Sequence, residues 1–146
     1  MAFLENLLAL FSNDIEVDLS PQAVVVRCGA RSVSLRPVVH LSTATPPKVL
    51  AVGDAPGFTE PHQCVELFRP TPHLGAAVSK GACLEAFFTY AVHCVVSSRV
   101  LVRPRMIVFG VSSLRDVFGG YEEWVFAEVL AKAGARACEF RSGVNP

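Results

Sequence analysis

The succession of β-type and helix-type patterns along the chain constrains its fold more than any other feature. Residues 15–19 read Ile-Glu-Val-Asp-Leu, which alternates apolar and acidic side chains as a half-buried strand does. Residues 23–28 are an apolar, valine-rich run, and residues 32–36 alternate again, with turn residues between the three runs. These patterns predict a three-stranded antiparallel meander, whose third strand continues through residues 38–42 after Pro37.

The pattern then changes to alternating helices and strands. Apolar residues recur at helical spacing over residues 80–97, where Ser79 is the expected N-cap, and again over residues 121–132. Residues 105–111 are a continuous apolar run of the kind found in central parallel strands, and residues 137–140 predict a last short strand. A meander followed by helix, strand, helix and strand predicts an α/β fold on one mixed sheet, which is the order of a ribonuclease H-like half-domain.

The chain is expected to form one domain after a separate N-terminal segment. Its length of 146 residues fits one ordinary domain. Residues 48–54 predict a short strand, and residues 55–78 are a proline-rich insertion, interpreted as a loop with a short strand near residues 65–68. The predicted organisation is an amphipathic segment over residues 1–11 and a single domain over residues 12–146.

Composition narrows the classes of partner. Hydrophobic residues make up 51% and charged residues 18% of the chain, which predicts a well-filled core rather than disorder. Thirteen basic residues balance thirteen acidic ones, so no basic field favours nucleic acid as a partner. The five cysteines are odd in number and have no C-x-x-C spacing, which predicts buried thiols, such as Cys94, in a reducing cytoplasm.

Common catalytic and metal-binding patterns do not occur in the sequence. The four histidines lack metal-ligand spacing, and there is no nucleophile elbow, P-loop or dinucleotide-binding glycine motif. His93 lies in an apolar helical run and is expected to be a hydrogen-bonded core residue, whereas His62 and His73 could meet Cys64. A ribonuclease H-type nuclease would need further carboxylates beside Asp18, and the other predicted strands supply none. We therefore expect no catalytic residue, no metal and no cofactor.

The first eleven residues carry an apolar helix face. Its large side chains include Phe3, Leu4, Leu7, Leu8 and Phe11. One interpretation is docking of this face on the body of the domain or on a protein partner. The other is a helix lying in the plane of the membrane at the inner face of the cell, although such helices usually carry Lys or Arg and this segment has only Glu5. With no spanning run and no signal peptide, a cytoplasmic location is expected.

Four short motifs resemble, in the same order, the bacterial actin family of MreB. Residues 11–19 are similar to the opening of that family, where a membrane-binding helix leads into the first strand. Residues 48–53 resemble the strand of that family that ends in Ala-Val-Gly. Arg69-Pro70 resembles the Arg-Pro that precedes its first long helix. Residues 133–136 resemble the Gly-Ala-Arg that precedes the last strand of its subdomain I. The resemblance is collinear from residue 1 to residue 140 and implies a degenerate, actin-like counterpart of MreB subdomain I.

The departures from this family fall in its phosphate loop. Actins have Asp-x-Gly-Thr after the first strand, because glycine and backbone donors let the loop wrap the nucleotide phosphates. Here Asp18 is kept, Ser20 stands in place of glycine, and Pro21 in place of threonine removes a donor. The resemblance thus implies Asp18, Ser20, Gln22 and Glu122 as vestigial nucleotide-binding positions. Glu122 falls where the family has its water-orienting glutamate, and the other interpretation is a solvated carboxylate at a helix start.

These observations together predict a non-catalytic structural or interaction protein. The expected partner is another protein or further copies of the chain, in a scaffold linked to cell shape or the cytoskeleton. An actin fold also needs a second half to close its ATP cleft, and the sequence ends at residue 146. The alternatives are one half of a split ATP-binding actin homologue, or a membrane-associated adaptor that works through residues 1–11.

Overall fold

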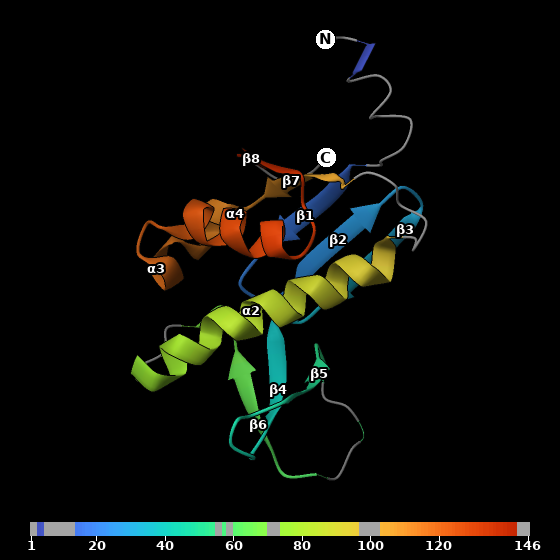
Figure 1. The fold of residues 1–146 in the computed structure, drawn as a ribbon. Coiled ribbons are helices and arrows are strands. Elements are labelled where there is room, and N and C mark those ends of the chain that lie inside the picture. The colour runs from blue at the N-terminus through green and yellow to red at the C-terminus, as the bar shows by residue number, and fades with distance from the viewer. Residues whose placement is uncertain are drawn as a thin grey trace.

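The computed structural model describes residues 3–4, 14–54, 57, 60–69, 74–96 and 103–142, with residues 74–79 described by their backbone alone. The chain is a mixed α/β fold, shown in Figure 1. Its elements in chain order are β1 (Ile15–Leu19), β2 (Val24–Cys28), β3 (Arg31–Leu35), β4 (Val38–Ser42), β5 (Val49–Val52), β6 (His62–Glu66), α2 (Leu74–Val95), β7 (Arg105–Phe109), η1 (Val111–Leu114), α3 (Arg115–Phe118), α4 (Glu122–Lys132) and β8 (Ala137–Arg141).

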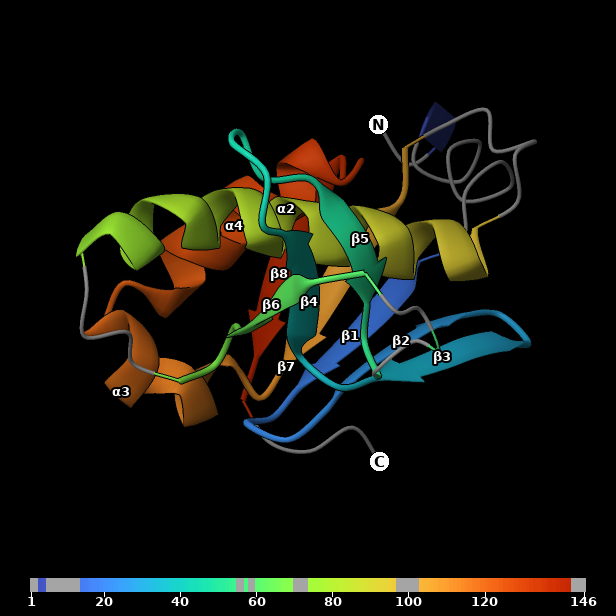
Figure 2. The same cartoon turned by 90° about the horizontal axis from the view of Figure 1, so that it is seen from below.

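A five-stranded mixed sheet forms the centre of the molecule. Its strand order is β3-β2-β1-β7-β8, in which β1, β2 and β3 are antiparallel neighbours while β7 and β8 run parallel to β1. Helices α2 and α4 lie on one side of this sheet, as Figure 2 shows, and alternate strand residues such as Val17 and Val108 are fully buried beneath them. The prediction of an α/β fold with helix, strand, helix and strand after the meander is confirmed.

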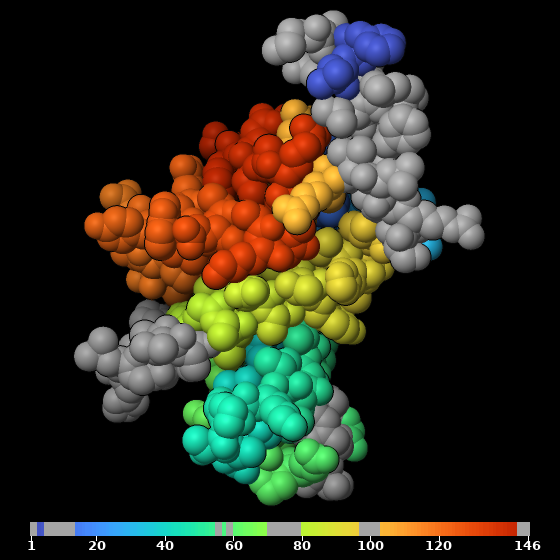
Figure 3. Space-filling model, viewed as in Figure 1, coloured from blue at the N-terminus to red at the C-terminus, as the bar shows by residue number. Residues whose placement is uncertain are grey.

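A second sheet corrects the prediction that residues 38–42 extend the third strand of the meander. Val38 donates its N–H to Arg36 O at 2.8 Å across Pro37, and this three-residue turn ends β3. The chain then enters a three-stranded sheet of order β5-β4-β6. α2 lies between this second sheet and α4, and it occupies the middle of the molecule in Figure 3. Proline therefore separates two sheets here rather than interrupting one strand.

The long helix begins earlier than the sequence predicts. α2 starts at Leu74, and the expected cap Ser79 lies within it. Residues 74–79 contain no proline, so nothing in them stops the helix after Pro72. The short strand expected near residues 65–68 is β6, which ends at Glu66, and the buried Leu67 and Phe68 follow it.

The last turn of α2 overturns two predictions of burial. His93 and Cys94 are exposed, whereas Val92 and Val95 are buried. The core-facing positions of α2 include Leu84, Phe88 and Val95, and at 100° per residue positions 93 and 94 point away from them. The apolar residues that recur at helical spacing mark the buried face, and His93 and Cys94 lie off it. Cys83 on the inner face is buried, and desolvation raises the pKa of its thiol.

The predicted meeting of His62 and His73 with Cys64 is not tested by the described residues. His73 lies outside them, Cys64 is exposed, and the His62 ring packs edge-on against His40 with centroids 5.1 Å apart. His40 is buried in β4 and its Nε2 lies 3.2 Å from Gly53 O. No group of three or more potential metal ligands occurs in the part of the chain that the structure describes.

Candidate functional site

The candidate site lies at the carboxyl ends of the parallel strands β1 and β7, where open α/β sheets commonly bind ligands. Gly110 follows β7 with φ +77°, and a Cβ placed on it would lie 2.3 Å from Leu19 O. Only glycine permits this close approach of the two strand ends. The approach fixes the turn that follows β1 beside the end of β7.

The turn after β1 is closed on itself. Ser20 donates its N–H to Ala23 O at 3.0 Å, and Ser20 Oγ both donates to Ala23 O at 3.0 Å and accepts from Ala23 N at 3.1 Å. Pro21 has no N–H. Of the backbone N–H groups of residues 20–23, only that of Gln22 takes no part in these internal hydrogen bonds. A phosphate cradle needs several convergent N–H groups, and this turn does not offer them.

The Asp18 carboxylate forms an ion pair with Arg27. Asp18 Oδ2 accepts a hydrogen bond from Arg27 Nη1, with 23% and 40% of the two side chains exposed. Arg27 lies on β2 opposite Glu16, one alternation along from Asp18 on the same face of the sheet. The charge that would face a metal or its waters is therefore neutralised within the sheet. The sequence patterns did not single out Arg27 as a site residue. The alternation of side chains along β2 nevertheless places it on the same face of the sheet as Asp18.

Glu122 is buried, which makes the interpretation as a solvated carboxylate wrong. It begins α4 with 9% of its surface exposed, and its Oε2 has no hydrogen-bond partner among the described residues. Phe118 at the end of α3 and Phe126 on α4 lie four residues before and after it, and their rings are in edge contact. The α4 N-terminus is a favourable place for a negative charge, but an unsatisfied buried oxygen still costs stability.

A small pocket separates the turn from the second sheet. It holds about 170 Å³, and its lining includes Pro21 and Gln22 of the turn together with Arg36, Glu66 and Arg69. Glu66 pairs with Arg36 at 3.6 Å and with Arg69 at 3.1 Å. Pockets for small molecules usually hold roughly 300–1,000 Å³. The pocket is too small for a nucleotide, and its charged residues are paired with one another.

Lys80 is a buried cation near this pocket that the sequence did not single out. Its Nζ donates to Arg69 O at 2.8 Å and lies 5.6 Å from the centre of the Phe118 ring. Burial lowers the pKa of Lys80, because the charged form is desolvated. The lysine thus joins α2 to Arg69, one of the residues that line the pocket.

Comparison with solved structures identifies the fold. MreB5 of Spiroplasma citri bound to AMPPNP superposes with a TM-score of 0.58 and 12% identity, and the same protein bound to ADP with 0.53 and 14%. Each match covers 90% of this chain. The fold is that of an actin-like half-domain. The chain spans 38% of the length of these MreB5 structures. No protein-family model matches the chain, and no curated protein matches its sequence.

The outer sheet face of this actin-like half-domain is charged. On the side away from α2 and α4 the strands carry Glu16, Asp18, Arg27, Arg105, Glu139 and Arg141. Arg105 pairs with Asp14 at 2.6 Å and with Glu139 at 3.6 Å, and the Asp14 carboxylate raises the pKa of the Arg105 guanidinium. Sheets covered by helices on both faces have nearly continuous apolar strands. Here Ile107 and Phe109 on β7 are the buried apolar residues of a face that otherwise suits water.

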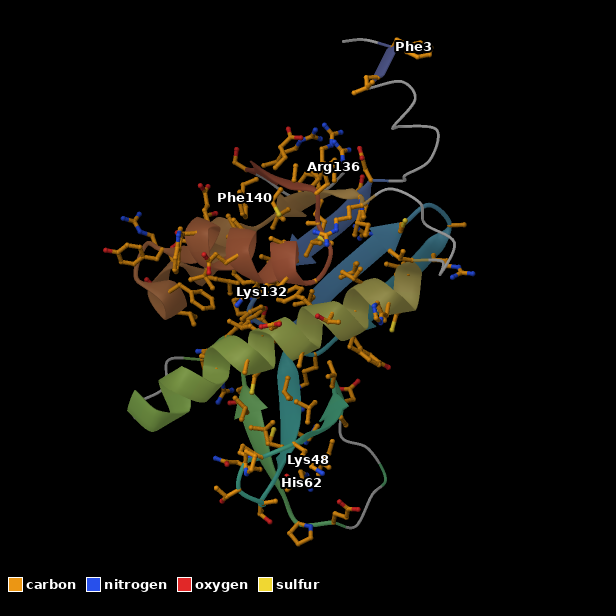
Figure 4. All side chains as sticks on the ribbon, in the orientation of Figure 1. Phe3, Lys48, His62, Lys132, Arg136 and Phe140 are labelled. Atoms are coloured by element: carbon orange, nitrogen blue, oxygen red, sulfur yellow. The ribbon has the colours of Figure 1, made fainter. Side chains whose placement is uncertain are left out.

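The N-terminal residues predicted to contact a membrane or a partner are described in part. Phe3 and Leu4 are 76% and 61% exposed, and Figure 4 shows Phe3 away from both sheets. Leu7, Leu8 and Phe11 lie outside the described residues. Among the helices that the structure describes, none combines the length and the apolar character needed to cross a membrane.

Proposed function

We propose that this actin-like half-domain is a non-catalytic structural protein that works by binding proteins, either partners or copies of itself, in a cytoplasmic scaffold of the cytoskeleton. The observation that carries the proposal is the turn of residues 20–23. Two of its three backbone N–H groups, those of Ser20 and Ala23, bond within the turn, and the preceding Asp18 is held by Arg27. Catalysis of ATP hydrolysis needs donors and a metal-facing carboxylate at this position, and both are engaged elsewhere.

The charged outer face of the sheet supports a role that does not depend on a further helical layer. A layer packed there would desolvate charged residues that are now paired with Asp14 or with a residue of the same or a neighbouring strand. Burying an ion pair costs several kcal/mol per ion unless its geometry is excellent. The half-domain is accordingly suited to function with this face in water.

A second candidate function is one half of a split ATP-binding actin homologue. Glu122 favours it, because a buried carboxylate with an unsatisfied oxygen lowers stability and is more readily explained by a ligand than by packing. It sits at the start of α4, the position that the resemblance to MreB assigns to a glutamate orienting the attacking water. In this alternative a second chain supplies the rest of the cleft.

Thermal unfolding with Mg-ATP tests the proposal. We expect no change in the melting temperature at millimolar Mg-ATP, because the turn and the small pocket cannot hold the phosphates. A ligand present at a hundredfold excess over its Kd would stabilise the protein by about 2.7 kcal/mol, which is readily measured. Stabilisation that Asp18→Asn and Glu122→Gln both abolish would contradict the proposal and support the split ATP-binding homologue.

A further inference from the structure

The N-terminal segment of residues 1–11 exposes large apolar side chains. Phe3 and Leu4 are 76% and 61% exposed, and Figure 4 shows Phe3 away from both sheets. The sequence predicts one continuous apolar helix face for the segment. An exposed apolar patch of this kind marks a surface that another molecule covers. Because the body of the same chain does not cover Phe3 and Leu4, the occupant of this face belongs to a different molecule.

A groove of matching character runs between β5 and α2. It has a volume of about 610 Å³, and its lining includes Val49 on β5 and Ala82, Ala86 and Tyr90 on α2. Val49 and Tyr90 are 45% and 48% exposed. Figure 2 shows β5 lying along α2. An apolar groove is the kind of surface on which proteins bind the apolar face of an amphipathic helix.

The length of the groove fits the N-terminal segment. α2 lines the groove from Ala82 to His93, and the helix rises by about 17 Å between these two residues. A helix formed by residues 1–11 would also be about 17 Å long. The segment can therefore lie along the groove over its whole length.

The charges around the groove give the docked segment a direction. Lys48 precedes β5 and Asp54 follows it, both are exposed, and neither side chain has an ion-pair partner in the described part of the chain. Glu85, which lines the groove, already forms an ion pair with α4. Glu5 is the one charged side chain of residues 1–11. The Lys48 end of the groove therefore attracts the segment, and the Asp54 end repels it.

We propose that the N-terminal segment of one copy of the chain docks in the groove between β5 and α2 of the next copy. This proposal rests on the proposed function and names the partner as the chain itself. The contact joins two different patches, so each copy offers its segment to one neighbour and its groove to another. Assembly through such a contact continues beyond the dimer unless the copies close into a ring.

Two variants that block opposite halves of the contact test the docking. Phe3→Asp/Leu4→Asp removes the apolar face of the segment, and Ala86→Arg places a charged side chain in the groove. Light scattering over a hundredfold concentration range should show each variant alone associating at least about a hundredfold more weakly than the wild type, because large apolar side chains lose their cover. An equimolar mixture keeps one intact segment and one intact groove, so it should form a 1:1 dimer and nothing larger.

Ala131→Arg is the matched control for the groove variant. Ala131 is exposed on α4 and does not line the groove, so its replacement should leave association unchanged. Near-ultraviolet circular dichroism checks that every variant is folded. Thr89→Arg blocks the groove about one turn along α2 and takes the place of Ala86→Arg if that variant does not fold.

Charge reversal tests the direction of docking. Glu5→Lys and Lys48→Glu each place like charges at one end of the contact and should each weaken association about threefold, as expected for an exposed ion pair. The double variant Glu5→Lys/Lys48→Glu restores opposite charges and should associate as the wild type does.

Three results would overturn the docking. The first is a mixture of the two blocked variants that stays monomeric although the wild type associates, and the second is a folded groove variant that associates as the wild type does. The third is a wild-type chain that stays monomeric, whether or not it co-sediments with phosphatidylglycerol vesicles through Phe3 and Leu4, which would show lipid as the cover of this face. Failure of the proposed function is detected separately, by thermal stabilisation with Mg-ATP.

Discussion

Gly110→Ala is expected to lower the free energy of unfolding by at least about 3 kcal/mol. An alanine at φ +77° costs about 1–2 kcal/mol, and its Cβ would lie 2.3 Å from Leu19 O, which is backbone and cannot rotate away. The ends of β1 and β7 must then separate, and the turn of residues 20–23 moves with them. Urea denaturation followed by circular dichroism measures the loss.

Gly119→Ala is the matched control for this change. Gly119 also has a positive φ, +63°, but a Cβ placed on it meets nothing within 4 Å. Its replacement should therefore lower the free energy of unfolding only by the cost of a positive φ for alanine, about 1–2 kcal/mol. Equal losses in the two variants would contradict the close approach of the two strand ends.

Phe126→Ala is expected to lower the free energy of unfolding by about 3–5 kcal/mol. Phe126 on α4 is fully buried and makes edge-to-face contacts with Phe68, Phe88 and Phe118, at centroid distances of 6.0, 5.6 and 5.4 Å. Its removal leaves a cavity where α2, α3, α4 and the segment after β6 meet. The same urea titration measures the effect.

Trp124→Ala provides the comparison on the same helix. Trp124 is two residues away on α4 and 64% exposed, so its loss should cost less than about 1 kcal/mol. A loss for Phe126→Ala no larger than that for Trp124→Ala would show that the aromatic cluster is not the centre of the core.

Local patterns were sufficient to predict the five-stranded sheet. Alternation at residues 15–19, a continuous apolar run from residue 105 and a helix ended near Gly134 each reflect burial by a neighbouring element. The second sheet could not be predicted in this way. β4 and β5 pair with each other, and they could do so either as part of the first sheet or as part of a separate one. What places them in a separate sheet is the turn at Pro37, which ends β3.

The candidate site was predictable in part. Asp18, Ser20 and Pro21 could be singled out because the resemblance to the MreB family aligns them with its phosphate loop, and a proline there removes a donor whatever the rest of the fold does. The Arg27 ion pair depends on the register between β1 and β2, and the burial of Glu122 depends on how α4 packs. Both are tertiary properties, for which the sequence offers residue types but not distances.

Light scattering on the wild-type chain, over a hundredfold concentration range with and without Mg-ATP, tests the central claim most directly. The account predicts a mass that rises reversibly with concentration along the same curve in both conditions, because the turn in place of the phosphate loop is closed on itself and association does not need a nucleotide. A monomer at every concentration, or an assembly that Mg-ATP forms or dissolves, would contradict it.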